Sequence, residues 1–181
     1  MIFRETILPG CFIIELEPKS DDRGWFARTY CRDEFQRAGI DVNWLQINHS
    51  HTSKKGTIRG MHYQLPPHAE AKLIRCVHGA VYDVAVDIRN GSPTFLQWVA
   101  VELSPENGRM IYIPPGMAHG FQSLTDNAAL IYHHSAMFQP GYEGGLHSAD
   151  PRLGISWPLP LTVISDRDQS HPFINQNFKG I

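Results

Sequence analysis

The stretch Gly108-Arg-Met-Ile-Tyr-Ile-Pro114-Pro115-Gly116-Met-Ala-His119 carries the strongest structural signal in this chain. It opens with a turn glycine, and the apolar, β-branched run at 110–113 is typical of a strand. Pro-Pro-Gly then forms a rigid turn, because proline fixes φ and glycine permits a positive φ. His119 follows as the chain enters the next strand. The stretch therefore predicts two short strands joined by a tight turn, with a histidine just after it.

Similar short apolar runs, each bounded by turn residues, lie on both sides of this stretch. We predict strands at 80–88, 98–103, 110–113 and 128–134. The first of these alternates regularly, so its side chains divide between two faces. One face carries Tyr82, Val84, Val86 and Ile88, and the other carries Val81, Asp83, Ala85 and Asp87. Many short strands at this spacing indicate an all-β sandwich or barrel.

Helical signals are few. One short helix is expected at 33–38, with Asp33 as its N-cap and Gly39 as its stop. The segment 165–181 carries few apolar residues and is expected to be irregular. No internal repeat or linker divides the sequence, so residues 1–181 are expected to form a single domain.

Composition limits the classes of function. Hydrophobic residues make up 42% of the chain and charged residues 19%, as in ordinary globular proteins. The net charge of -2 argues against nucleic-acid binding, and no apolar stretch is long enough to cross a membrane. The N-terminal residues do not resemble a secretory signal. Cys11, Cys31 and Cys76 are widely spaced and odd in number, which favours free thiols in the cytoplasm.

The chain contains ten histidines, more than its length would suggest. Four of them occur as adjacent or alternating pairs: His49, His51, His133 and His134. Such spacing is compatible with metal binding, but one strand pair gives at most two ligands on a face, and no third ligand is evident. We therefore expect these four side chains to face solvent or to be hydrogen-bonded.

The quoted stretch resembles the second sequence motif of the cupin fold, which has glycine, proline, glycine and histidine at the same spacing. The first cupin motif normally supplies two alternating histidines and a downstream glutamate as metal ligands. Here the corresponding stretch reads Gly60-Met-His62-Tyr-Gln64, so glutamine replaces the second histidine. The ligand set is incomplete, and we predict a cupin jelly roll with no metal and no cofactor. His62 is then available for proton chemistry.

A longer series of motifs, in order from about Pro9 to about Pro172, resembles the family of dTDP-4-dehydrorhamnose 3,5-epimerases. The matching stretches cover nearly the whole chain, and together they are far more specific than any one of them. They are Asp22-Arg-Gly-Trp-Phe26, Gln46-Ile-Asn-His-Ser50, Arg59-Gly-Met-His-Tyr-Gln64, Pro66-Pro67-His68, Lys72-Leu-Ile-Arg75, Val84-Ala-Val-Asp-Ile-Arg89, Ser92-Pro-Thr-Phe95, Pro114-Pro-Gly116, His119-Gly-Phe121, Asp150-Pro151, Ile155-Ser-Trp-Pro158 and Ser165-Asp-Arg-Asp168.

The resemblance implies acid–base chemistry beside a ketone. Inversion at a carbon next to a carbonyl requires a base on one face, an acid on the other and a group that stabilises the enolate oxygen. By resemblance, His62 is the base, Asp168 fixes its tautomer, Tyr132 is the acid and Lys72 stabilises the enolate. Alone, each of these residues would have an ordinary structural explanation, and their joint occurrence in matching motifs is what favours catalysis.

The resemblance also implies a nucleotide-diphosphate sugar as substrate and a homodimer, with Arg23 reaching into the neighbouring site. The substrate-binding residues that it implies are Arg23, Phe26, Gln46, Asn48, Arg59, His119, Phe138, Glu143 and Arg167. Strict alternation along one strand puts Arg59 and His62 on opposite faces. Arg59 therefore needs a strand end or a β-bulge to reach the same ligand.

Three positions depart from the family pattern. Arg28 replaces a glutamate associated with the nucleotide end of the substrate, which makes a CDP-linked sugar a credible alternative. Ile47 replaces an aspartate and removes a polar contact. Phe138 replaces a tyrosine, and the loss of this hydroxyl bears on whether carbon 3, carbon 5 or both are inverted.

The predicted function is epimerisation at carbon 3, carbon 5 or both of a nucleotide-linked 4-keto-6-deoxyhexose, for deoxysugar and surface-polysaccharide (O-antigen) synthesis. The alternatives are an epimerase specific for one carbon of a CDP-linked sugar, a nucleotide-sugar keto-isomerase, a metal-dependent cupin and a non-catalytic sugar-binding cupin. Bound iron, zinc or manganese after purification would favour the metal-dependent cupin.

Overall fold

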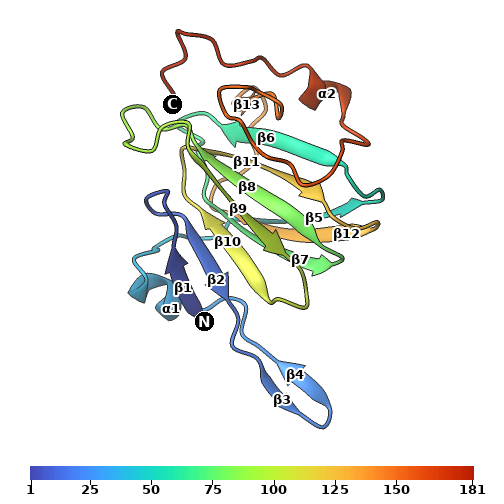
Figure 1. The fold of residues 1–181 in the computed structure, drawn as a ribbon. Coiled ribbons are helices and arrows are strands. Elements are labelled where there is room, and N and C mark those ends of the chain that lie inside the picture. The colour runs from blue at the N-terminus through green and yellow to red at the C-terminus, as the bar shows by residue number, and fades with distance from the viewer.

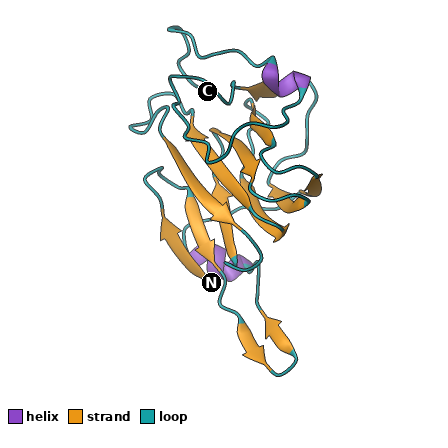
Figure 2. Ribbon diagram, turned by 45° about the vertical axis from the view of Figure 1, so that its right-hand side comes forward, coloured by secondary structure: helices purple, strands orange, loops and turns teal.

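Two antiparallel β-sheets face one another across an apolar interior. The computed structural model describes residues 1–181, which contain two short helices and otherwise strands and loops (Figures 1 and 2). The first sheet runs in the order β1 (Ile2–Glu5), β2 (Phe12–Glu15), β10 (Arg109–Ile113), β7 (Lys72–His78), β12 (Ala128–His134) and β5 (Gln46–Thr52). The second runs in the order β13 (Glu143–Gly145), β6 (Ile58–Gln64), β11 (Met117–Ser123), β8 (Val81–Asp87) and β9 (Trp98–Leu103).

The expected all-β fold is confirmed, and each predicted strand agrees with an observed one within one residue at either end. The alternation predicted along β8 is also confirmed. Val81 and Ala85 belong to the hydrophobic cluster between the two sheets, together with Ile74, Ile111 and Leu130. The opposite face of β8 packs into a second cluster, on the outside of the second sheet.

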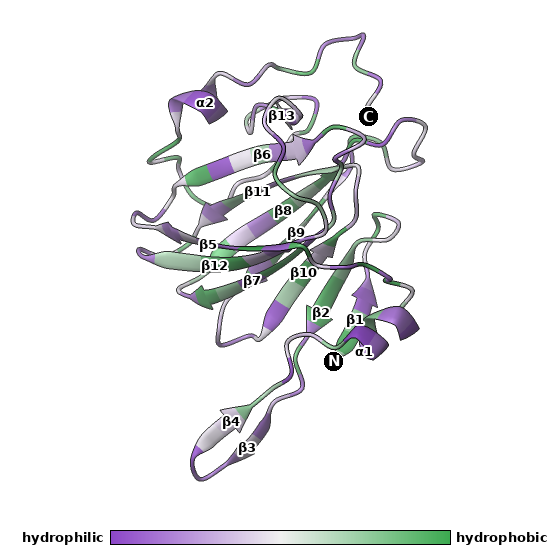
Figure 3. Ribbon diagram, turned by 180° about the vertical axis from the view of Figure 1, so that it is seen from behind, coloured by the Kyte–Doolittle hydropathy of each residue, from purple (hydrophilic) through white to green (hydrophobic).

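The outer face of each sheet is covered by a segment outside the sheets: the second sheet by the C-terminal segment and the first by a region near the N-terminus. The C-terminal segment packs Trp157, Ile174 and Phe178 over the second sheet, where the chain crosses above β6 and β11 in Figure 1. The first sheet is covered by helix α1 (Arg32–Arg37), whose Phe35 is buried against Phe3 and Tyr30 in a cluster that also includes Trp44. The outer faces of both sheets therefore carry apolar side chains as well, and Figure 3 shows hydrophobic stretches in strands of both sheets, interspersed with hydrophilic ones.

Both expectations about helices need correction. Helix α1 begins at Arg32 with Cys31 as its N-cap, which forms no side-chain cap, so the predicted cap at Asp33 is wrong. Asp33 instead lies in the first turn, where a negative charge is favourable near the helix N-terminus. The predicted stop at Gly39 agrees with its φ of 81°. The segment 165–181 is irregular except for helix α2 (Asp166–Gln169), which is capped by Ser165.

A hairpin of β3 (Lys19–Asp21) and β4 (Gly24–Phe26) projects away from the two sheets (Figure 1). It pairs only with itself and forms a separate two-stranded sheet. Trp25 and Phe26 on this hairpin are both exposed. Neither helix of the protein has the length and apolar character needed to span a bilayer.

Candidate active site

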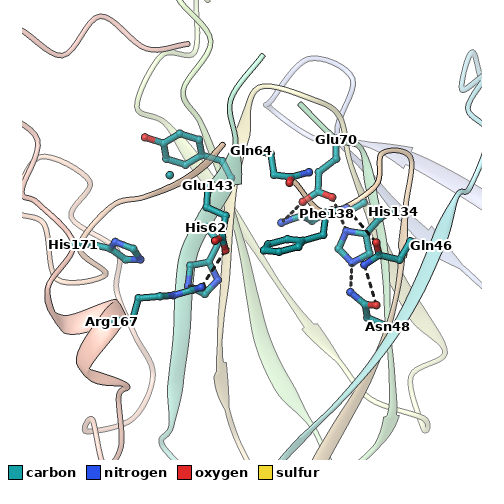
Figure 4. A pocket seen from close by; sticks show the side chains of 13 residues that line it. Gln46, Asn48, His62, Gln64, Glu70, His134, Phe138, Glu143, Arg167 and His171 are labelled. Atoms are coloured by element: carbon teal, nitrogen blue, oxygen red, sulfur yellow. Dashed lines mark hydrogen bonds and ion pairs between the residues drawn. The ribbon is translucent and has the colours of Figure 1, made fainter. Parts of the chain in front are cut away.

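A polar pocket of about 300 Å³ opens at one end of the space between the two sheets (Figure 4). One wall comes from the first sheet and the other from the second sheet and helix α2. It is lined by Gln46, Asn48, His62, Tyr63, Gln64, Glu70, Lys72, His134, Phe138, Glu143, Gly144, Arg167 and His171. A neighbouring cavity of about 250 Å³, which shares His62 and Lys72 with the pocket, adds Arg59, His119 and Tyr132. Eleven of the thirteen predicted site residues thus line these cavities or, in the case of Asp168, lie beside one of their lining residues.

The expected β-bulge is present in β6. His119 of β11 pairs with His62, but Phe121, two residues further, pairs with Arg59, three residues back. The extra residue lets Arg59 and His62 line the same cavity despite their odd spacing. Gly60 is needed here because its φ is 127° and a Cβ would lie 2.5 Å from the Cα of Gly120.

His62 and Asp168 meet although 106 residues separate them in sequence. The imidazole Nε2 lies 2.7 Å from Oδ1 of Asp168, and the backbone N–H of Gly60 donates to Oδ2 at 3.0 Å. Burial alone would raise the pKa of Asp168, but these hydrogen bonds lower it to about 2. Asp168 is therefore a carboxylate at neutral pH, and it favours the His62 tautomer that carries its proton on Nε2. Nδ1, which has no hydrogen-bond partner in the chain, is then free to accept a proton.

Tyr132 lies on β12 of the first sheet, across the cavity from His62 on β6 of the second sheet. Its hydroxyl shares a hydrogen bond of 3.0 Å with Ser50. Burial raises the pKa of Tyr132 above its usual value, so the phenol keeps its proton at neutral pH. A protonated phenol in this position is suited to donate a proton and unsuited to act as a base.

His119 is also paired with a carboxylate, which the sequence analysis did not include among the site residues. Its Nε2 lies 3.0 Å and 2.9 Å from the two oxygens of Asp83, and both side chains are buried. The signal was present, because the alternation along 80–88 puts Asp83 on the face shared by Val81 and Ala85, where a charge requires a partner. The His119 ring stands edge-on to Tyr132 at 6.1 Å.

The opposite wall holds Lys72 among polar groups. Its Nζ lies 3.2 Å from Glu70, and the second oxygen of Glu70 is 2.8 Å from Nδ1 of His134. Neither Glu70 nor His134 was predicted from the sequence to be a site residue. For His134 the available signal was the strand face that it shares with Tyr132. Glu70 lies in a loop, so periodicity gives no indication of its direction.

The four paired histidines divide as expected except for one. His49 and His51 are largely exposed, and His134 is hydrogen-bonded. His133 is half-buried against Trp44, with ring centroids 5.9 Å apart, and its Nδ1 has no hydrogen-bond partner. The expectation fails for His133 because the aromatic cluster around α1 covers it.

The other predicted binding residues at the pocket form two small groups. Gln46 donates to Asn48 at 3.1 Å and accepts from the backbone N–H of Phe138 at 3.2 Å. On the facing wall Arg167 pairs with Glu143 at 3.1 Å. The amide groups and the Phe138 ring thus lie on one side of the pocket and the Glu143–Arg167 pair on the other, as Figure 4 shows.

Two predicted binding residues lie outside the pocket of their own chain. Arg23 and Phe26 belong to the projecting β3–β4 hairpin (Figure 1), where the Arg23 side chain is 90% exposed and pairs with Asp21. Of the three departures from the family pattern, Phe138 lines the pocket, Ile47 is exposed on β5, and Arg28 pairs with Glu34 at 2.9 Å.

His171 joins His62 and Asp168 in a group whose ligand atoms all lie within 4.8 Å of one another. Its Nε2 is buried without a hydrogen-bond partner and lies 3.7 Å from Asp168. Such a group resembles a metal site, but the guanidinium of Arg167 lies 3.1 Å from Nε2 of His62 and 3.6 Å from Asp168. A fixed positive charge at this point opposes the binding of a metal cation by the group.

The fold and its pocket place the protein among carbohydrate epimerases built on the cupin jelly roll. A family model described as dTDP-4-dehydrorhamnose 3,5-epimerase matches residues 5–176, and the chain belongs to this family. It is 44% identical over 165 residues to the dTDP-4-dehydrorhamnose 3,5-epimerase of Shigella flexneri, covering 91% of both chains. It is 39% identical over 170 residues to the dTDP-4-dehydrorhamnose 3-epimerase of Streptomyces niveus, covering 93% of this chain and 82% of the relative.

A solved structure supports the same assignment. The crystal structure of dTDP-4-dehydrorhamnose 3,5-epimerase from Bacillus anthracis, with TDP and PPi bound, superposes with a TM-score of 0.93. The two chains are 35% identical, and the match covers 96% of this chain and 99% of the other. Both the fold and the family expected from the sequence are thereby confirmed.

Proposed function

We propose that the protein inverts carbon 3, carbon 5 or both of a dTDP-linked 4-keto-6-deoxyhexose by removing and returning a proton through an enolate. The observation that carries this proposal is the position of His62 and Tyr132 on opposite sheets, with one cavity between them. An acid and a base on opposite faces of a sugar ring are what inversion requires.

In the first step, Nδ1 of His62 takes the proton from the carbon beside the ketone. Asp168 holds the proton of Nε2, so the imidazole presents its lone pair to the substrate and its charge is stabilised as it becomes an imidazolium. Negative charge then develops on the ketone oxygen. Lys72, whose ammonium lines both cavities, stabilises the resulting enolate electrostatically.

In the second step, the hydroxyl of Tyr132 donates a proton to the same carbon from the opposite face. Its raised pKa keeps it protonated until the enolate forms, and Ser50 stabilises the phenolate that remains. The net result is inversion at that carbon. No electron leaves the substrate, so the reaction needs no redox cofactor.

Binding of the nucleotide diphosphate requires positive charge. Arg59 and Arg167 line the cavities and are suited to bind phosphate oxygens through paired N–H groups. Gln46, Asn48, His119 and Glu143 bind sugar hydroxyls, and Phe138 packs against the ring. Arg23 and Phe26 act in the pocket of a second subunit of a homodimer, a role that suits their exposure on a projecting hairpin.

A second candidate is an epimerase that inverts one carbon only, on a dTDP- or a CDP-linked sugar. Phe138 favours it because a pocket residue without a hydroxyl has one hydrogen-bonding group fewer for the sugar. A 3-epimerase relative also shares 39% of its aligned residues with this chain. In either case we propose that the protein is a single domain and acts in the cytoplasm. Its product would be a deoxysugar precursor of a surface polysaccharide such as O-antigen.

Proton NMR in deuterium oxide, with dTDP- and CDP-4-keto-6-deoxyglucose as parallel substrates, tests the proposal. We expect the wild type to place deuterium at carbon 3, carbon 5 or both, and His62→Ala to slow this exchange by about 10³-fold because it removes the base. His51→Ala is the matched control, because His51 is an exposed histidine outside both cavities.

The outcome separates the alternatives. Deuterium at one carbon only would favour the second candidate, and the preferred substrate would identify the nucleotide. No exchange with either substrate, in a protein that remains folded by circular dichroism, would refute the epimerase proposal.

A further inference from the structure

Lys72 is held by a buried carboxylate that has no place in the mechanism described above. Its Nζ lies 3.2 Å from Oε1 of Glu70, while Oε2 of Glu70 lies 2.8 Å from Nδ1 of His134. The side chains of Glu70 and Lys72 are both 10% exposed, and that of His134 is 12% exposed. All three groups line the pocket, with Glu70 and His134 on the wall that faces His62 (Figure 4) and Lys72 beside His134 on the same sheet. A buried cluster of this kind is costly to assemble, so it calls for an explanation.

The backbone fixes the geometry of the cluster. Lys72 and His134 are direct neighbours across the β7–β12 ladder. Ala71 accepts a hydrogen bond from the backbone N–H of Ser135 at 3.0 Å, and its own N–H donates to the Ser135 hydroxyl at 2.7 Å. These two bonds hold the loop that carries Glu70 against the end of β12. The carboxylate is therefore directed between the two side chains.

The charges of Glu70 and its two partners are also compatible with a role in positioning Lys72. Burial by itself would raise the pKa of Glu70, but His134 and Lys72 lower it below its usual value, so Glu70 is charged at neutral pH. An unpaired carboxylate 3.2 Å from the Lys72 ammonium would repel the negative charge that develops on the enolate oxygen. Here one oxygen is engaged by His134, which in turn lies 3.3 Å from Asn48 through its Nε2. Lys72 uses one of its three N–H donors on Glu70, which leaves the others for the substrate.

We propose that Glu70 and His134 are positioning residues that hold the Lys72 ammonium at the place where the enolate oxygen forms. This inference rests on the proposed function for its kinetic consequence. Lysine is a flexible side chain, and an unanchored ammonium would sample many rotamers. Because misplacement of a catalytic group by about 1 Å can cost up to about 100-fold in rate, anchoring at one oxygen is sufficient to matter.

The kinetic test compares Glu70→Ala with Glu70→Gln. We expect Glu70→Ala to lower kcat for deuterium exchange by about 30-fold with KM changed less than about threefold, since Lys72 loses its anchor. Glu70→Gln keeps an oxygen that accepts from Lys72, so it should retain at least about a third of kcat. Glu102→Ala, at an exposed position on β9, is the control. An undiminished kcat in Glu70→Ala, or equal losses in both variants, would overturn the proposal.

A second measurement does not depend on catalysis. The rate at which acetic anhydride acetylates Lys72, measured by mass spectrometry of the folded protein, reports how firmly the amine is held. We expect Glu70→Ala to react at least about threefold faster at Lys72 than wild type, with His134→Ala intermediate. Equal rates in all three proteins would refute the anchoring. If instead the wild type exchanged no deuterium while Glu70→Ala changed acetylation as expected, the epimerase proposal alone would fail.

Discussion

Two histidine–carboxylate pairs lie side by side in this protein, and they differ mainly in their exposure. His62 and His119 are direct partners across the β6–β11 ladder, while their carboxylates come from helix α2 (Asp168) and strand β8 (Asp83). In the first pair the side chains are 31% and 5% exposed. In the second they are 6% and 0% exposed. The chemistry of the groups is the same, so any difference in role must come from their surroundings.

The exposure of the imidazole and its hydrogen bonding distinguish the two pairs. His62 is bonded to one oxygen of Asp168, and its ring borders both cavities. His119 is bonded to both oxygens of Asp83, and burial lowers its pKa, so it stays neutral at pH 7. A neutral, buried imidazole acts as a fixed hydrogen-bonding group. His62 is therefore the better placed of the two to act as a base, although His119 also lines the second cavity.

Glutamine at each histidine gives the sharpest comparison. Gln reaches the carboxylate in place of Nε2 but offers nothing in place of Nδ1. We expect His62→Gln to lower kcat for deuterium exchange by about 10³-fold, because the base is lost. His119→Gln should raise KM by less than about tenfold and leave kcat within about threefold. Equal losses of kcat in the two variants would contradict the distinction between the pairs.

Replacing each aspartate with asparagine tests the contribution of the carboxylate to each pair. In Asp168→Asn the amide oxygen accepts from Gly60, so the amide N–H₂ faces His62 and forces its proton onto Nδ1. We expect kcat to fall by about 10²-fold, because this is the wrong tautomer for a base. Asp83→Asn should keep kcat within about tenfold.

Of the same two variants, Asp83→Asn should lose more stability, although it should lose less activity. In Asp83→Asn a buried amide N–H is left without a partner, which should cost about 1–3 kcal/mol in free energy of unfolding. Urea unfolding alongside the kinetic assay measures both effects. A larger kinetic loss in Asp83→Asn than in Asp168→Asn would reverse the proposed roles.

Acid unfolding gives the smallest predicted effect. The pKa of Asp168 is about 2 in the folded protein, below its ordinary value near 3.9 when unfolded. A lowered pKa contributes stability above pH 4, and this contribution is lost as the pH falls from 4 towards 2. We expect the stability difference between wild type and Asp168→Asn to shrink by about 2 kcal/mol over this range.

Urea unfolding at pH 6, 4, 3 and 2 measures this difference. Asp22→Asn serves as the control, because Asp22 is an exposed loop carboxylate. A difference between wild type and Asp168→Asn that stays constant from pH 6 to pH 2 would show that the carboxylate does not carry the predicted stabilisation.

Much of the fold could be predicted because local sequence patterns report local structure. Alternation along 80–88 correctly assigned both faces of β8, and Pro-Pro-Gly at 114–116 marked the turn between β10 and β11. The alternation of side chains along β6 likewise required a β-bulge between Arg59 and His62, and the structure contains it. The N-cap of α1 was assigned two positions late, because Cys31 caps the helix without the side-chain hydrogen bond that would have identified it.

The site was less predictable, because its contacts join distant parts of the chain. The sequence by itself determined the all-β fold class, the family and the residue types needed for proton transfer. Only the tertiary structure decided that Asp168 reaches His62, that Asp83 accepts from His119 and that Glu70 lies between Lys72 and His134. The physical reason is that the side-chain period of a strand fixes which face a residue occupies. The packing of sheets, loops and a C-terminal helix fixes which residues meet.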